Sequence, residues 1–327
     1  KISNTFIKSG NQYKTVDFEN EKDRINTYFR NNGVYHFQPN YVTFDLDTLN
    51  NNKKVNVDLI INNYSFQEND TTRTEPFKIY KISDVNIYTD YSPNESNLIT
   101  DSSSYKNFNL YSRTKLKYRP KAITDAVFIS KGSLFADNKT VLTTRYLNNL
   151  KIFNYPAIQY VNDTRDTTAQ SLIAKIYLTP RKKYSFGISS DFTHSNIQDI
   201  GIGGAASLTI RNIFNGAEAL EISGRGNIGA SKDLANPKDN FFNVSEYGMD
   251  LKLNFPRIFM PFPTEKIIPK SMIPSTLIAV GLSVQRNIGL DKENFTSSLS
   301  YNWSPKKNTN ASLNLINIQF VRNLNPQ

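Results

Sequence analysis

The chain has 327 residues, enough for two or three domains, and a net charge of +10 from 39 Lys and Arg against 29 Asp and Glu. It has no Cys, which excludes disulfides and thiolate metal sites. Its two His fall in different predicted domains, so we expect neither a metal nor a cofactor. The basic residues are spread along the chain and no G-x-S-x-G nucleophile turn occurs, so neither nucleic-acid binding nor enzymatic activity is expected.

The N-terminal region has the pattern of a helix followed by two strands. Residues 19–32 show helical spacing, with Ile25 and Phe29 one turn apart, and Gly33 supplies a left-handed stop. Strand-like runs follow at 37–44 and 55–61, separated by a polar turn. The sequence therefore predicts an αβ domain over residues 1–64 that lacks an opening strand, which indicates that the chain begins inside a domain.

The same order recurs downstream. A helix is expected over 138–150 and strands over 155–161 and 171–178. Tyr35 aligns with Phe153 and Val55 with Ile173 at one offset (153 − 35 = 173 − 55 = 118), as expected for a repeated unit. Residues 77–88 add an opening strand, 89–111 a loop insertion and 126–135 a short element before the helix. Residues 77–183 are thus predicted to form a β-α-α-β-β domain, with two unrelated pieces of similar order as the alternative.

From Tyr184 onward the pattern changes to period two. Tyr184, Phe186 and Ile188 alternate with small or polar residues, and similar runs continue to Val321, giving about seven strands of transmembrane length. This number is too small to close a single-chain barrel, so residues 184–327 are predicted to be the N-terminal portion of an antiparallel transmembrane β-barrel. A parity change between Leu315 and Ile316 predicts a β-bulge. A soluble β-sandwich also alternates and is the alternative.

Several segments resemble one known family. Phe128-Ile-Ser-Lys-Gly-Ser-Leu-Phe, Thr144-Arg-Tyr-Leu-Asn-Asn-Leu-Lys-Ile-Phe and Ile176-Tyr-Leu-Thr-Pro-Arg resemble the POTRA domains of the BamA/TamA superfamily of outer-membrane assembly factors. Glu21-Lys-Asp-Arg-Ile, Asn32-Gly-Val-Tyr and Phe44-Asp-Leu-Asp-Thr are particularly similar to the TamL branch. The stretch from Gly201 to Glu218 resembles the early barrel hairpin of the family. Its periplasmic turn would hold Arg211, Asn212, Phe214, Gly216 and Glu218.

The resemblance implies a bacterial outer-membrane protein with its N-terminal domains in the periplasm. Such a protein captures unfolded outer-membrane proteins by β-augmentation and aids their insertion, with membrane lipids as further partners. The edge strands expected to bind clients contain Tyr41, Val42, Phe44, Ile158, Tyr160 and Val161. The first barrel strand, predicted from Tyr184 to Thr193 and expected to act as a lateral gate, presents Tyr184, Phe186, Ile188 and Phe192.

Alternative functions fit the same pattern. Within the family, a TamA-like module would work with a TamB-like periplasmic partner in translocation or lipid transport. A two-partner secretion transporter, and a passive pore or surface adhesin, are alternatives of other classes.

Overall fold

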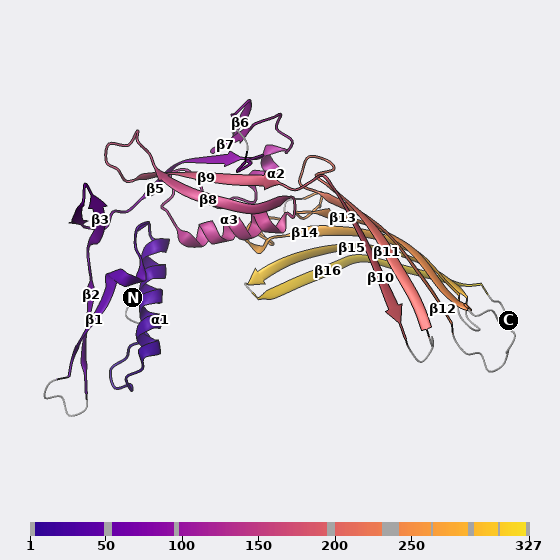
Figure 1. Ribbon diagram of the computed structural model, residues 1–327, viewed down its shortest axis with the longest axis horizontal. Helices are drawn as coiled ribbons and strands as arrows, with labels where there is room; N and C mark the ends of the chain where they lie inside the picture. Colours follow the sequence, from indigo (N-terminus) through magenta and orange to yellow (C-terminus); the bar gives the residue numbers. More distant parts are fainter. Residues whose placement is uncertain are drawn as a thin grey trace.

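The structure is a computed structural model that describes residues 4–48, 54–94, 98–194, 200–230, 242–262, 264–286, 291–306 and 308–324. Two αβ units are followed by a long, curved, seven-stranded antiparallel sheet (Figure 1). Among the described residues, no helix combines the length and apolar character needed to cross a membrane. The two units and the sheet follow one another along the chain in the order that the sequence predicts.

In the first unit, helix α1 (Thr15–Asn31) lies beside the two-stranded antiparallel sheet of β1 (Val42–Asp47) and β2 (Asn56–Ile61). A small core forms where Ile25 of the helix meets Val34, Phe37 and Val42. Gly33 ends the helix with φ +97°, and a Cβ there would lie 2.7 Å from Ile79 Cγ2, so glycine is required for both conformation and space.

One expectation for the first unit was wrong, and one hairpin was not predicted. Residues 37–41 are not a strand: Pro39 opens a single 3-10 turn, η2 (Pro39–Tyr41), and extended pairing begins only at Val42. The second hairpin, β3 (Tyr64–Glu68) with β4 (Thr71–Glu75), was not predicted. Its two-residue turn, Asn69 and Asp70, has φ values of 45° and 63°, the left-handed conformation that Asn and Asp tolerate in tight hairpins.

The second unit has a five-stranded sheet in the order β6-β7-β5-β9-β8. At its centre β5 (Lys81–Tyr88) is parallel to β9 (Ser171–Pro180), which pairs antiparallel with the edge strand β8 (Phe153–Asn162). Helix α3 (Asp137–Asn149) contacts β8, and the short helix α2 (Pro120–Thr124) precedes it. The elements β5, α2, α3, β8 and β9 follow in the order β-α-α-β-β, with β6 and β7 inserted between β5 and α2. The ends of α1 and α3 differ by the repeat offset (149 − 31 = 118).

The sequence misplaced two parts of this unit. Residues 101–112, expected in a loop, form the hairpin β6 (Asp101–Tyr105) and β7 (Phe108–Ser112), and β7 pairs parallel with β5. Leu110 of β7 is fully buried, so the hairpin is an integral part of the sheet and its core. The short element expected over 126–135 is displaced: α2 lies before it, and Leu134 forms an isolated bridge to Lys81 instead.

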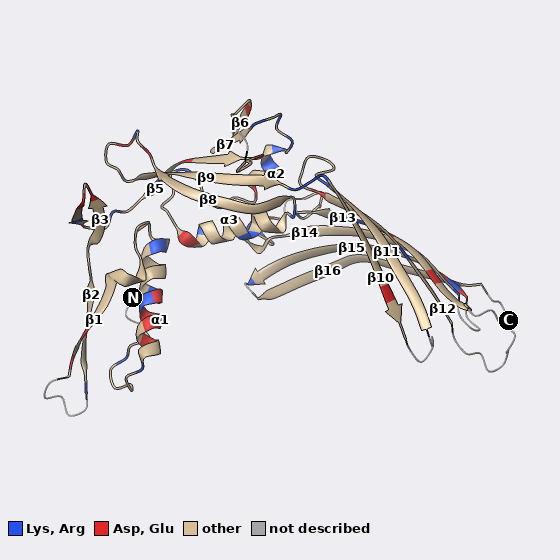
Figure 2. Ribbon diagram, in the orientation of Figure 1, with Lys and Arg blue, Asp and Glu red and all other residues tan. Residues whose placement is uncertain are grey.

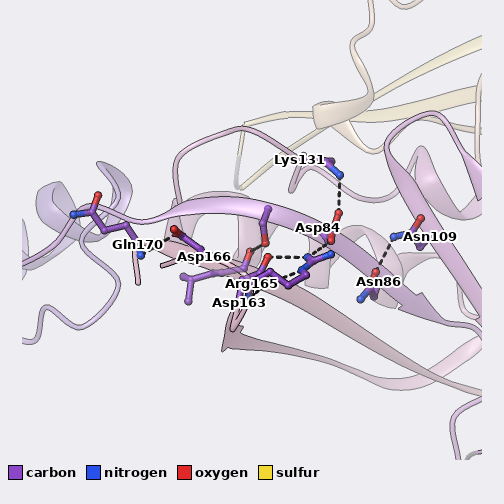
Figure 3. Close-up of polar contacts among 10 residues, drawn as sticks. Asp84, Asn86, Asn109, Lys131, Asp163, Arg165, Asp166 and Gln170 are labelled. Carbon is purple, nitrogen blue, oxygen red and sulfur yellow. Dashed lines mark hydrogen bonds and ion pairs between the residues drawn. The ribbon is translucent and has the colours of Figure 1, made fainter. Parts of the chain in front are cut away.

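A polar cluster fastens the β8–β9 loop to β5 (Figure 3). Arg165 pairs with Asp163 at 2.7 Å and also with Asp84, which in turn accepts a 2.7 Å hydrogen bond from Lys131 Nζ. These bonds, from Lys131 first and then Arg165, lower the pKa of the Asp84 carboxyl. The β8–β9 loop is therefore held to β5 by charge-assisted hydrogen bonds, which are stronger than hydrogen bonds between neutral groups.

The seven-stranded sheet pairs each strand with its neighbours in sequence. Its strands are β10 (Tyr184–Thr193), β11 (Ile200–Arg211), β12 (Ala219–Ala230), β13 (Val244–Phe255), β14 (Ser275–Arg286), β15 (Lys292–Lys306) and β16 (Thr309–Asn323). Register passes from Leu299 opposite Ile316 to Ser300 opposite Asn314, which leaves Leu315 without a partner residue. The β-bulge predicted from the parity change is thus confirmed.

Candidate functional site

The residues predicted to act fall at three places: the edges of the αβ units, the edge of the long sheet and the turn that joins the two. In the second unit, β8 pairs with β9 on one side only within the described residues, so its outer backbone edge is open. Tyr160 packs against Phe135 and shares a hydrogen bond with Thr140 of α3, which holds its ring inward. Ile158 and Val161 are half-buried, so the backbone rather than these side chains is what the edge presents.

In the first unit, the predicted edge residues are mostly structural. Val42 is buried, and Phe44 packs edge-on against Phe18 at 5.0 Å. Tyr41 lies in the 3-10 turn, where its carbonyl accepts a hydrogen bond from Asn62 N. Among the described residues β1 pairs only with β2, so an unpaired edge is present here as well, but it begins at Val42.

Strand β10 is one border of the long sheet. It pairs with β11 along its whole length, from Tyr184 opposite Ile210 to Thr193 opposite Gly201, and its other side has no partner strand in the described part of the chain. Its apolar side chains point away from any packed core, with Ile188 77% and Phe192 83% exposed. An apolar, exposed edge strand of this length requires a partner or a lipid environment, because in water it would aggregate.

The turn between β11 and β12 brings the five predicted hairpin residues together. Glu218 is almost fully buried, and its carboxylate accepts hydrogen bonds from Gly216 N at 2.9 Å and Arg257 Nη2 at 2.8 Å. A Cβ at Gly216 would lie 2.2 Å from Glu218 Oε1, so the carboxylate fits only beside glycine. Phe214 at the tip is half exposed. A buried carboxylate is stable only with such partners, which makes this turn a rigid structure.

The same turn is bonded to the second αβ unit. Asn212 Nδ2 donates to Lys117 O at 2.8 Å, and Arg119 N donates to Asn215 O at 2.6 Å. On the other side of the junction, Tyr146 of α3 donates from its hydroxyl to Pro256 O at 3.1 Å. The turn and the segment after β13 therefore join the αβ unit to the long sheet.

Arg257 and Tyr146 are functional candidates that sequence reasoning missed. Arg257 follows β13 in a proline-rich segment and contacts a turn 39 residues earlier in the chain, and no local pattern marks it. With Tyr146 it lines a cleft of about 450 Å³ between α2, the turn and the segment after β13. Within the described residues, no three His, Asp or Glu are grouped closely enough to hold a metal ion.

The arrangement defines a class of fold: αβ units that lead directly into an open antiparallel sheet like part of a barrel. Searches of protein-family models and of curated proteins give no match to this sequence. Among solved structures, the chain is similar to BamA from Haemophilus ducreyi lacking POTRA domains 1–3, with TM-score 0.50 and 8% identity, over 97% of this chain and 53% of that one. This likeness shows a shared fold, in which the seven-stranded antiparallel sheet resembles part of a barrel.

Two further structures match less closely. One is CdiB from Acinetobacter baumannii, with a TM-score of 0.35 and 9% identity, over 96% of this chain and 55% of that one. The other is CdiB from Escherichia coli, with a TM-score of 0.31 and 9% identity, over 95% of this chain and 54% of that one. The chain spans about half the length of each of these three structures.

Proposed function

We propose that this chain is the POTRA-containing and early-barrel part of an outer-membrane assembly factor, which captures unfolded outer-membrane proteins and aids their insertion. The observation that carries the proposal is the pair of strand edges, β8 and β10, that have no partner strand in the described part of the chain. They belong to a unit and a sheet that are joined through the β11–β12 turn and the segment after β13. The fold shared with BamA supports it. On this proposal the barrel lies in the outer membrane and the αβ units lie in the periplasm.

The first step of the proposed activity is capture at β8. An edge strand accepts an extended client through backbone hydrogen bonds, so it binds many sequences without reading their side chains. The regular part of this edge runs from Ala157 to Asn162, because the register is broken between Asn154 and Ala157. The β1 edge, from Val42 to Asp47, is a second capture site of the same kind.

The second step is templating at β10. In a bilayer each backbone amide must find a partner, so a barrel strand that parts from its neighbour offers a strong template for an incoming strand. The unpaired border of β10 is the place where the complete barrel would close against its final strand. A client strand would pair with β10 while β10 and the final strand are apart.

A pair of engineered disulfides tests this step in the full-length protein. Cysteine at Ser189, linked to a facing cysteine on the final strand of the complete barrel, should abolish client assembly in depleted cells, and reduction should restore it. The matched control links Ser189 to Ala205, its register partner on β11. Because β10 and β11 stay paired in any case, the control should retain activity. A locked barrel that still assembles clients would refute lateral opening.

The finer assignment within the family rests on Glu21-Lys-Asp-Arg-Ile, Asn32-Gly-Val-Tyr and Phe44-Asp-Leu-Asp-Thr, and we propose the TamL branch on those segments. A TamA-like variant of the proposal adds a TamB-like periplasmic partner. It predicts that activity depends on that partner, so assembly by the purified protein alone in lipid vesicles would count against it. Steady ion conductance without any assembly activity would instead favour a passive pore.

A further inference from the structure

Basic residues that are distant in sequence gather where the second αβ unit meets the long sheet. The six residues of this basic collar are Lys115, Lys117, Arg119, Lys121, Lys182 and Lys183. They come from the segment that leads into α2 and from the link between β9 and β10 (Figure 2). In the sequence the basic residues are dispersed. In the fold the six residues of the collar lie on one surface.

The β11–β12 turn holds the two segments together. Lys117 O and Lys183 O accept hydrogen bonds of 2.8 Å from Asn212 and Arg211, respectively. Arg211 also donates from Nη1 to Lys182 O at 3.1 Å. Both basic segments are therefore fixed to one turn through their backbone carbonyls, and their lysines are exposed residues.

The charge of the collar is only partly offset locally. Asp125 and Glu265 line the same cleft as Arg119 and Lys121, whereas Lys115, Lys117, Lys182 and Lys183 are not part of that lining. All six side chains belong to exposed residues, and neither 113–121 nor 179–185 contains an acidic residue. Asp101 reaches this region, but its carboxylate accepts from Leu116 N. Within the described part of the chain, none of the six forms an ion pair, whereas the buried carboxylate nearby, Glu218, is paired with Arg257. Clustered like charges repel one another, so an arrangement of this kind indicates an anionic partner.

The position of the collar indicates which partner. Strand β10 begins at Tyr184, directly after Lys183, whose ammonium lies 5.7 Å from the centre of the Tyr184 ring. Tyr184 and Phe186 are exposed by 59% and 68%, as expected for the first lipid-facing positions of the strand. Aromatic residues of this kind mark the headgroup level of a membrane, so the collar lies at the height of the phospholipid phosphates.

We propose that the basic collar binds the anionic headgroups of phospholipids in the membrane leaflet that faces the αβ units. This inference rests on the membrane placement in the proposed function, and it adds a lipid site at the N-terminal end of β10. Headgroup binding there holds the αβ unit against the bilayer and concentrates anionic lipid beside the strand proposed to open.

The test counts lipid bound to the full-length protein in non-ionic detergent by native mass spectrometry. The probes are phosphatidylglycerol and phosphatidylcholine with identical acyl chains. A collar variant, K117Q/K182Q/K183Q, is compared with K8Q/K14Q/K54Q, which removes three exposed lysines from the first unit and changes the net charge equally. We expect the collar variant to bind phosphatidylglycerol more weakly, by about fivefold for each lysine removed, and phosphatidylcholine unchanged.

Three outcomes would overturn the inference. They are equal phosphatidylglycerol binding by the two triple variants, equal binding of the two lipids by the unaltered protein, and collar-dependent binding of polyglutamate without any lipid preference, which would identify an acidic protein partner. If the collar variant does not fold, the salt dependence of phosphatidylglycerol binding to the unaltered protein decides, because a phosphate contact weakens with ionic strength. Client assembly is measured separately by the disulfide lock, so either proposal can fail alone.

Discussion

Removal of Arg257 tests whether the junction depends on its buried ion pair. The Glu218 side chain is 1% exposed and that of Arg257 is 38% exposed, so Arg257→Met leaves a carboxylate that cannot reach water. Breaking a buried pair in this way costs about 3–5 kcal/mol. Because Arg257 is partly solvated and Gly216 N still donates to Glu218, we expect the lower end, about 3 kcal/mol. The measurement is urea unfolding of the folded protein in lipid vesicles, followed by Trp fluorescence.

Two further variants make this prediction sharp. Lys252→Met removes one partner of an exposed pair with Glu221, 3.8 Å apart and 48% and 44% exposed, and should cost less than about 1 kcal/mol. Replacing both members of the buried pair, Arg257→Met with Glu218→Met, should recover part of the loss, since no charge is then buried alone. The reasoning is refuted if Arg257→Met costs no more than Lys252→Met, or if the double variant is less stable than the single one.

Three more predictions concern the two faces of β13, the β11–β12 turn and the polar cluster around Asp84. Leu251→Arg should reduce membrane insertion more than Lys252→Leu, because a lipid-facing Arg costs about 2–4 kcal/mol at mid-bilayer; equal yields in the membrane fraction would contradict the assigned faces. Gly216→Ala should lower the urea midpoint by displacing the Glu218 carboxylate, whereas Gly226→Ala, whose Cβ would lie 3.4 Å from Tyr247, should be tolerated. Since the pKa of Asp84 is lowered in the fold, its stabilisation should be present above the unfolded pKa of about 3.9 and be lost as the pH falls further. Hydrogen-exchange protection factors of the β5 amides, corrected for the intrinsic exchange rate at each pH, that stay constant from about pH 6 to 3 would contradict this.

The long sheet could be predicted closely from the sequence. Alternation assigned β10 its observed bounds, Tyr184 to Thr193, and located the bulge at Leu315. The reason is physical: the strands place apolar side chains on one face and small or polar side chains on the other, so the pattern of period two is strong and a slip of one residue would reverse it. The local sequence is sufficient to predict a strand when the surroundings of its side chains alternate regularly along its length.

Other elements could not be predicted in this way. Strand β6 (Asp101–Tyr105) is a polar run of Asp and Ser, without the alternation or apolar content that identifies a strand, and its pairing with β7 decides its conformation. Of the site, the turn residues were predicted by resemblance. Tyr146 and Arg257 were not, because their contacts with Pro256 and Glu218 cross 110 and 39 residues of chain. Contacts between distant segments leave no periodic signal.

The link from β9 to β10 consists of three residues, 181–183. Even fully extended, such a link spans roughly 14 Å, so the sheet that contains β8 and the border strand β10 stay within a short distance of one another. On the proposed function, a client held at β8 is tethered near β10 rather than searching for it by free diffusion. Tethering at this range gives effective concentrations of the order of millimolar. Weak, sequence-independent pairing at each edge is then sufficient for transfer, and a client whose strands pair poorly with β8 can still be delivered.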